Sequence, residues 1–290
     1  MLASRIANHY PYFMPISKED LESPVFSVSE FRKFDGEQIS SLLTALEGYI
    51  FKVEDPSSIE RRVQFLHYDL NHHFVEQRPQ ATDLLTYLTT DRGLVAVPDS
   101  VAHSTFFRLS NLCHRRQTSR SLLALFLGCV FAKYELPCVH FVLDQKIFLR
   151  TRQDDRPIFF DLQNPTHFIN SDNLLHLMTQ SVDQSATLEV LSVRSLIILY
   201  LRFLKLNLLG EGQVNGYLRT LNVLIEIDAD NWRSTELVER GLFLARLNYS
   251  REALKDLKRY FHFCKDPYQD SAVVAAYKRL TRDAEKDLGV

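Results

Sequence analysis

The feature that most constrains this chain is the order of its hydrophobic periodicities. Apolar residues recur at helical spacing from about residue 36 to residue 134. Residues 137–161 then hold three short runs of β-forming residues joined by polar links, and the helical spacing returns from about Leu188. Helices followed by adjacent strands, without β–α–β alternation, predict an α+β fold with a small antiparallel sheet, followed by an all-α tail.

The length of 290 residues fits about two domains, which agrees with this change of pattern. We expect an irregular N-terminal arm at 1–34, an α+β domain at 35–185 and helical hairpins at 186–290. Within the α+β domain, the pattern predicts helices over 36–51, 83–94, 101–112 and 119–134, with a turn at 95–99. Ser17 and Asp20 could cap a short helix within the arm.

Composition and charge exclude several functional classes. Lys and Arg total 34 against 36 Asp and Glu, and this balance argues against nucleic-acid binding across the whole chain. No glycine-rich phosphate-binding motif occurs, so we expect no cofactor. The longest apolar run, Leu122–Phe131, is too short to span a bilayer. Four cysteines without a CxxC motif favour a reducing compartment, so we expect a soluble, cytoplasmic protein that makes no membrane contact.

The tail carries the clearest packing signal. Gly241 and Ala253 lie on consecutive predicted helices, where two such small residues allow the helix backbones to approach closely. Larger residues around them, Leu237, Leu244 and Leu257, would then interlock. This arrangement is typical of tetratricopeptide-like hairpins and predicts a protein partner that binds through the helical repeats, with Gly241 and Ala253 in the binding module. Because two hairpins cannot bury their faces alone, we expect residues 268–286 to form a capping helix.

The middle of the chain resembles a known family in the order of its features. These features are a basic turn at Arg115-Arg116-Gln117, an apolar helix at Ser121–Tyr134, Leu136-Pro137, and the segments 146–150 and 160–164. With a tetratricopeptide-like tail behind them, they resemble the bacterial SirB family of transglutaminase-like proteins over about residues 35–265. The resemblance implies a papain-like α+β core followed by helical repeats.

Catalysis by such a core requires a cysteine at the N-terminus of the central helix, a histidine on the neighbouring strand and an aspartate on the next. The resemblance places Ser121, Lys146 and Asp161 at these three positions. A protonated lysine cannot accept the serine proton, so we expect a Lys146–Asp161 ion pair and a non-catalytic, protein-binding or regulatory pseudoenzyme. The alternative is a hydrolase or transferase with an unconventional Ser-Lys-Asp arrangement.

A basic cluster precedes the central helix. Arg115, Arg116 and Arg120, with His114 beside them, could bind phosphate at the helix N-terminus. The same residues would equally suit a solvated turn. A nucleic-acid regulator is therefore a third and weaker interpretation.

Other reactive side chains give weaker signals. His67, Asp69, His72 and His73 lie close together on one predicted helix, but no fourth metal ligand is evident, so we expect no metal site. Cys113 lies before the central helix and does not match the nucleophile position. His140, within an apolar strand, is expected to be a hydrogen-bonded core residue.

Overall fold

The structure is a computed structural model that describes residues 16–21, 35–75, 78–143, 146–153, 156–163, 168–171, 173–174, 176, 189–227, 235–263 and 271–287. The chain divides into two compact units, which we call the core unit (residues 29–211) and the helical unit (residues 1–28 and 212–290). The described chain is mostly helical with a small antiparallel sheet, which confirms the predicted α+β class.

The core unit contributes most of the helices. In chain order they are α2 (Gly36–Phe51), α3 (Ser57–His73), α4 (Ala81–Thr86), the π-helical η2 (Tyr87–Asp91), the 3-10 helix η3 (Ser104–Phe107), α5 (Leu109–Arg115), α6 (Arg120–Lys133) and α8 (Val193–Gly210). Helix α2 begins where the Asp35 carboxylate accepts hydrogen bonds from two backbone N–H groups, and it ends at Lys52, which is left-handed with φ 52°. The helices predicted at 36–51 and 119–134 are confirmed.

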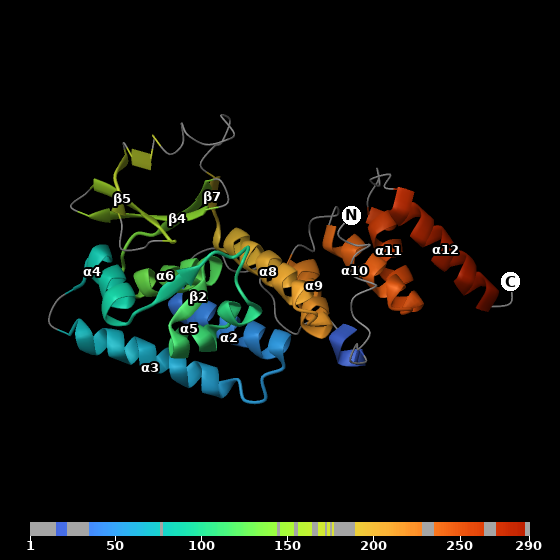
Figure 1. Cartoon of the computed structure of the whole chain (residues 1–290), viewed down its shortest axis with the longest axis horizontal. Helices are drawn as coiled ribbons and strands as arrows, with labels where there is room; N and C mark the ends of the chain where they lie inside the picture. Colours follow the sequence, from blue (N-terminus) through green and yellow to red (C-terminus); the bar gives the residue numbers. More distant parts are fainter. Residues whose placement is uncertain are drawn as a thin grey trace. The chain divides into compact units, whose positions relative to one another are not determined.

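Helix α6 is the centre of the core unit. Every residue from Arg120 to Phe131 is buried, as expected for a helix that is apolar on all sides. The sheet lies over α6, helix α2 packs on its other side, α5 packs against α2 and α3, and α3 is outermost (Figure 1). These layers fix the position of the α6 N-terminus, where the nucleophile was predicted.

The sheet has five antiparallel strands in the order β6-β5-β4-β3-β7. They are β3 (Val139–Leu143), β4 (Lys146–Gln153), β5 (Arg156–Asp161), β6 (Phe168–Ile169) and β7 (Glu189–Leu191). The three predicted strands are confirmed as the meander β3-β4-β5, with β6 and β7 at the edges.

Two local predictions were wrong. The turn expected at 95–99 begins instead with β1 (Val95–Val97), which pairs in parallel with β2 (Gln117–Ser119). The helix expected at 101–112 is split into η3 and α5 because Arg108 between them is extended, with φ −95° and ψ 128°. Both changes arise from tertiary pairing that the local sequence does not encode.

The helical unit contains η1 (Lys18–Leu21), α9 (Val214–Ile227), α10 (Thr235–Arg246), α11 (Ser250–Phe263) and α12 (Ser271–Asp287). Helices α10 and α11 form an antiparallel hairpin, and α12 packs against both of them. The described part of the expected arm, residues 16–21, forms η1 against α9, with Asp20 hydrogen-bonded to Ser17 as predicted. The domain boundary expected near 185 falls instead after Glu211, since α8 packs on α6 within the core unit.

A buried polar network connects the elements of the helical unit. Asp20 accepts a hydrogen bond from Arg219, and its backbone carbonyl accepts one from Asn222 at 2.9 Å. Arg240 donates to the Asn222 side chain at 2.6 Å and makes a bidentate pair with Asp256 at 2.7 and 2.6 Å. The network therefore joins η1, α9, α10 and α11 into one packed body.

Candidate functional site

The N-terminus of α6 is held by two polar side chains. The Ser121 hydroxyl and its backbone N–H both donate to the Asp99 carboxylate, the N–H at 3.1 Å. The Ser119 hydroxyl accepts the N–H of Leu122 at 3.2 Å. Ser121 is completely buried, so its hydroxyl serves this cap and does not meet solvent.

The electrostatics at this cap involve Asp99 and Arg120. Burial raises the pKa of Asp99, and the hydrogen bonds from Ser121 and the nearby positive charge of Arg120 oppose that rise only in part. Arg120 is itself buried, and its Nε lacks a hydrogen-bond partner within the described residues. The predicted basic cluster is therefore divided: Arg115 and Arg116 are exposed, whereas Arg120 lies inside the protein beside Asp99.

Lys146 and Asp161 lie on the opposite face of the sheet from α6. His140 faces α6, because its ring donates a hydrogen bond to the Ala124 carbonyl, and its cross-strand partner is Leu149. Lys146 is three residues from Leu149 and so points away from α6. Asp161 pairs with Phe148, on the same face as Lys146. The structure thus does not bring Ser121 together with Lys146 and Asp161.

Lys146 and Asp161 also remain apart from each other. Lys146 is exposed at the start of β4. Asp161 ends β5 half-buried, and its carboxylate accepts the backbone N–H of Gln163 at 2.8 Å. Among the described residues, no ion pair joins the two, so the expected contact is missing from this arrangement.

Cys138, the residue before β3, lies near His140. The Cys138 Sγ lies 3.8 Å from the His140 Nε2, and both residues line a cavity of about 370 Å³ beside α6 and β7. Burial lowers the pKa of His140 to about 4 and raises the pKa of the Cys138 thiol. The thiol is therefore protonated and weakly nucleophilic. The prediction that His140 is a hydrogen-bonded core residue is confirmed.

The side chains weighed as metal ligands on α3 have other partners. Asp69 forms an ion pair with Arg92 at 2.8 Å and accepts a hydrogen bond from the Tyr87 hydroxyl at 2.7 Å. The His73 ring stacks on Tyr87 with centroids 4.0 Å apart. Within the described ranges, no group of His, Cys, Asp and Glu side chains is placed to hold a metal ion. Burial raises the pKa of Cys113 to about 12, which leaves that thiol unreactive as well.

A groove of about 900 Å³ opens between α2, α3 and the end of α6. Helices α2 and α3 are close at one end, where a Cβ on Gly48 would lie 3.3 Å from Pro56. The walls carry hydroxyl, amide and imidazole groups, among them Ser40, Gln64 and His67. Burial and the nearby Lys133 lower the pKa of His67 to about 4, so its ring is neutral near pH 7. The groove offers hydrogen bonds to a ligand.

The close crossing predicted in the tail is confirmed. A Cβ on Gly241 would lie 3.0 Å from the Leu257 side chain and 3.4 Å from the Ala253 carbonyl. Ala253 is fully buried. A small residue at position 241 therefore allows α10 and α11 to cross closely.

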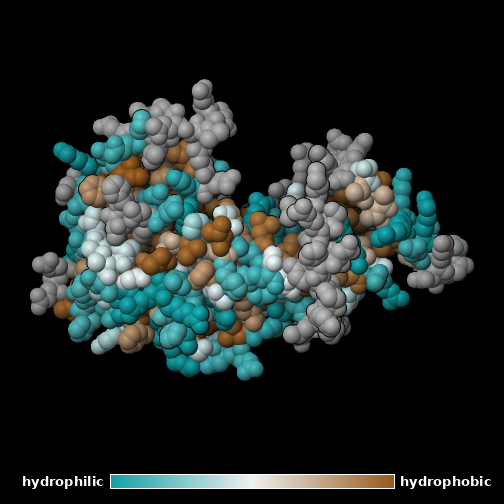
Figure 2. Space-filling view, viewed as in Figure 1, coloured by the Kyte–Doolittle hydropathy of each residue, from teal (hydrophilic) through white to brown (hydrophobic). Residues whose placement is uncertain are grey.

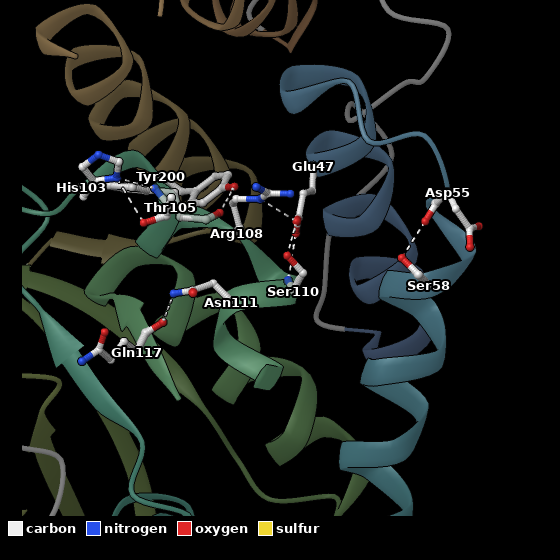
Figure 3. Close-up of polar contacts among 11 residues, drawn as sticks. Glu47, Asp55, Ser58, His103, Thr105, Arg108, Ser110, Asn111, Gln117 and Tyr200 are labelled. Atoms are coloured by element: carbon white, nitrogen blue, oxygen red, sulfur yellow. Dashed lines mark hydrogen bonds and ion pairs between the residues drawn. The ribbon is translucent and has the colours of Figure 1, made fainter. Parts of the chain in front are cut away.

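Sequence reasoning missed two acids, Glu47 and Glu211, that connect distant parts of the core unit. Glu47 accepts the Arg108 Nε and the Ser110 N–H, each at 2.9 Å, and so caps α5 (Figure 3). Glu211 accepts the N–H and hydroxyl of Ser104 at 2.6 Å and so caps η3. These partners are 63 and 107 residues apart along the chain, so local sequence patterns carry no signal for them.

No protein-family model, curated protein or solved structure matches this chain. Among the described helices, none has the combination of length and apolar character that crossing a bilayer requires. The fold and the site therefore define the class only as an α+β core unit with a helical-hairpin unit.

Proposed function

We propose that this chain is a bacterial, cytoplasmic, non-catalytic binding or regulatory protein, built from a degenerate transglutaminase-like core and a tetratricopeptide-like docking module. The observation that carries the proposal is the interlock of α10 and α11 at Gly241, Ala253 and Leu257. Such hairpins present rigid surfaces to partner proteins and contribute no chemistry of their own.

The surroundings of Ser121 support the non-catalytic part of the proposal. A nucleophile must reach its substrate, and Ser121 is completely buried and bonded to Asp99. The candidate base Lys146 lies on the other face of the sheet, as derived above. The groove between α2, α3 and α6 is a second possible docking surface because its walls are rich in hydrogen-bonding groups.

Affinity capture with in-cell crosslinking tests the docking role. The tagged full-length chain is expressed in bacterial cells, and crosslinked peptides are mapped by mass spectrometry. We expect a discrete protein partner whose crosslinks fall on α10–α12, and we expect the Gly241→Leu variant to lose it while retaining the circular dichroism of a folded core. Crosslinks confined to the core unit, or no partner at all, would overturn the proposal.

Activity-based probes test the rival hydrolase or transferase. The native protein is incubated with a fluorophosphonate and with iodoacetamide, and modified residues are identified by mass spectrometry. We expect no labelling of Ser121 and slower labelling of Cys138 than in urea. Stoichiometric modification of Ser121 in the native protein, abolished by Ser121→Ala, would favour the enzyme.

A further inference from the structure

The outer face of α11 carries a row of basic side chains, which we call the basic stripe. Its members are Arg251, Lys255, Lys258, Arg259 and His262, and all of them are exposed. Positions 251, 255, 258 and 262 recur at helical spacing, so they share one face over about three turns. The opposite face, with Ala253 and Leu257, is buried against the rest of the helical unit.

The C-terminal half of the basic stripe borders an aromatic cleft. Lys258, Arg259 and His262 line this cleft together with Phe261 of α11 and Tyr277 of α12. The Phe261 and Tyr277 rings touch, with centroids 4.8 Å apart. In the space-filling view, hydrophilic residues border apolar ones at this end of the chain (Figure 2). The surface therefore combines positive charge with an apolar contact.

Ion pairs within the described residues do not account for the positive charge of the basic stripe. Asp256, the buried acid of α11, is already bonded to Arg240. None of the ion pairs within the described residues uses Arg251, Lys255 or Lys258. The excess is local, since the whole chain has a net charge of −2.

The folding of α11 does not account for the basic stripe either. Cations four residues apart, such as Arg251 and Lys255, repel each other on a helix surface. Arg251 also lies in the first turn of α11, where the helix dipole disfavours a positive charge. Arg251 thus weakens the start of the helix that carries it, so helix stability does not explain its charge.

We propose that the basic stripe and its aromatic cleft bind an extended acidic peptide segment that carries one aromatic or large apolar side chain. From Arg251 to His262 the helix rises by about 16 Å at roughly 1.5 Å per residue. About five residues of extended chain cover that distance at roughly 3.3 Å each. Carboxylates along the segment pair with the stripe, and its apolar side chain enters the cleft beside Phe261 and Tyr277. This inference rests on the proposed docking function and names the chemistry of the partner.

Fluorescence anisotropy with a defined probe tests the inference. The probe is a fluorescein-labelled ten-residue peptide of Glu and Asp with a central Phe, titrated with the full-length protein. We expect saturable binding that weakens as salt is raised, because exposed charges are screened over about 8–10 Å at 0.1–0.15 M ionic strength. Replacing the central Phe of the probe by Ala should weaken binding further, and this change leaves the protein intact.

Two triple variants with equal charge change separate the stripe from general electrostatics. K255E/K258E/R259E should weaken binding by on the order of tenfold or more, since three exposed pairs become repulsive. R150E/R152E/R156E reverses three exposed arginines of β4 and β5 and should leave affinity within about twofold of the wild-type value. Circular dichroism confirms that both variants are folded.

Three outcomes would overturn the inference: no binding of the probe, equal loss in both triple variants, or tighter stripe-dependent binding of a single-stranded oligonucleotide. Each is distinguishable from failure of the proposed function. If crosslinking still maps a protein partner to α10–α12, and K255E/K258E/R259E does not affect its capture, the docking role stands and only the acidic partner is rejected.

Discussion

The two units hold their buried acids with different sets of donors. In the core unit, Asp99 accepts hydrogen bonds from the hydroxyl and N–H of Ser121, and Glu47 accepts from Ser110 as well as from the partly exposed Arg108. In the helical unit, Asp20 and Asp256 face the guanidinium groups of arginines. When an acid with neutral donors is removed, no unpaired charge remains in the protein. When an arginine that pairs with a buried acid is removed, the buried carboxylate remains without a counter-charge. The units should therefore differ in their sensitivity to mutation.

The pKa directions of the two acids also differ. Burial raises the pKa of Asp99, and the hydrogen bonds from Ser121 and the charge of Arg120 do not reverse that effect. Burial also favours a raised pKa for Asp20, but hydrogen bonds from Ser17, with the charge and hydrogen bond of Arg219, outweigh it and lower that pKa. The balance between burial and the sum of these contacts thus decides which form of each acid the fold stabilises.

The largest effect is expected from Arg240→Ala in the helical unit. It leaves Asp256, a buried carboxylate, without its bidentate partner. Breaking a buried ion pair from one side costs about 3–5 kcal/mol of the free energy of unfolding. Urea denaturation followed by circular dichroism measures it. The matched control is Arg61→Ala, whose exposed pair with Asp55 is screened by solvent and should contribute far less. Equal losses in the two variants would remove the contrast between buried and exposed pairs.

The second effect is a pH dependence in the core unit. His140 is buried, and burial lowers its pKa from 6.5 to about 4. Between these values the unfolded chain takes up a proton that the folded chain refuses, so the free energy of unfolding decreases as pH falls. The full window corresponds to about 3 kcal/mol, and none of it is lost above about pH 6.5. Comparing wild type with His140→Gln at pH 7 and pH 4.5 checks this, and an unchanged slope in the variant would contradict it.

A smaller effect is expected from Glu47→Gln. The variant loses the charge-assisted hydrogen bonds to Arg108 and Ser110, but Arg108 is partly exposed and can turn to water. We therefore expect a loss of about 1–3 kcal/mol. Asp55→Asn, at an exposed cap of α3, is the control and should lose less. A loss at Glu47 as large as that at Arg240 would show that the two units do not differ.

The smallest effect concerns two helical glycines. Gly241→Ala places a methyl group 3.0 Å from Leu257, so overpacking of about 1–3 kcal/mol opposes a gain in helix propensity of about 1 kcal/mol. We expect a net loss of about 1 kcal/mol. Gly210→Ala, with no atom within 4 Å of its added Cβ, should be neutral or slightly stabilising. Thermal unfolding of both variants measures the difference. A stabilising Gly241→Ala would contradict the close crossing of α10 and α11.

The sequence predicted the elements that local periodicity determines. Helix α2, the strands β3–β5 and the crossing at Gly241 and Ala253 all follow from spacing and residue size. The candidate site was less predictable. The alternation of side chains along β4 places Lys146 on the face away from α6. The environment of Ser121 is set by the carboxylate of Asp99, which lies 22 residues before it in the chain. Neither the register nor the long-range cap is encoded in a short window of sequence.

The hydrogen bonds between Asp20 and residues 219 and 222 set an order of events during synthesis. Their separations along the chain are 199 and 202 residues. At about 5–20 residues per second, the ribosome adds that length in about 10–40 s. Helix η1 is therefore made long before its partners exist, and all of residues 29–211 is made in the interval. The core unit can complete its folding on the ribosome. The helical unit folds later, once most of the chain has been made.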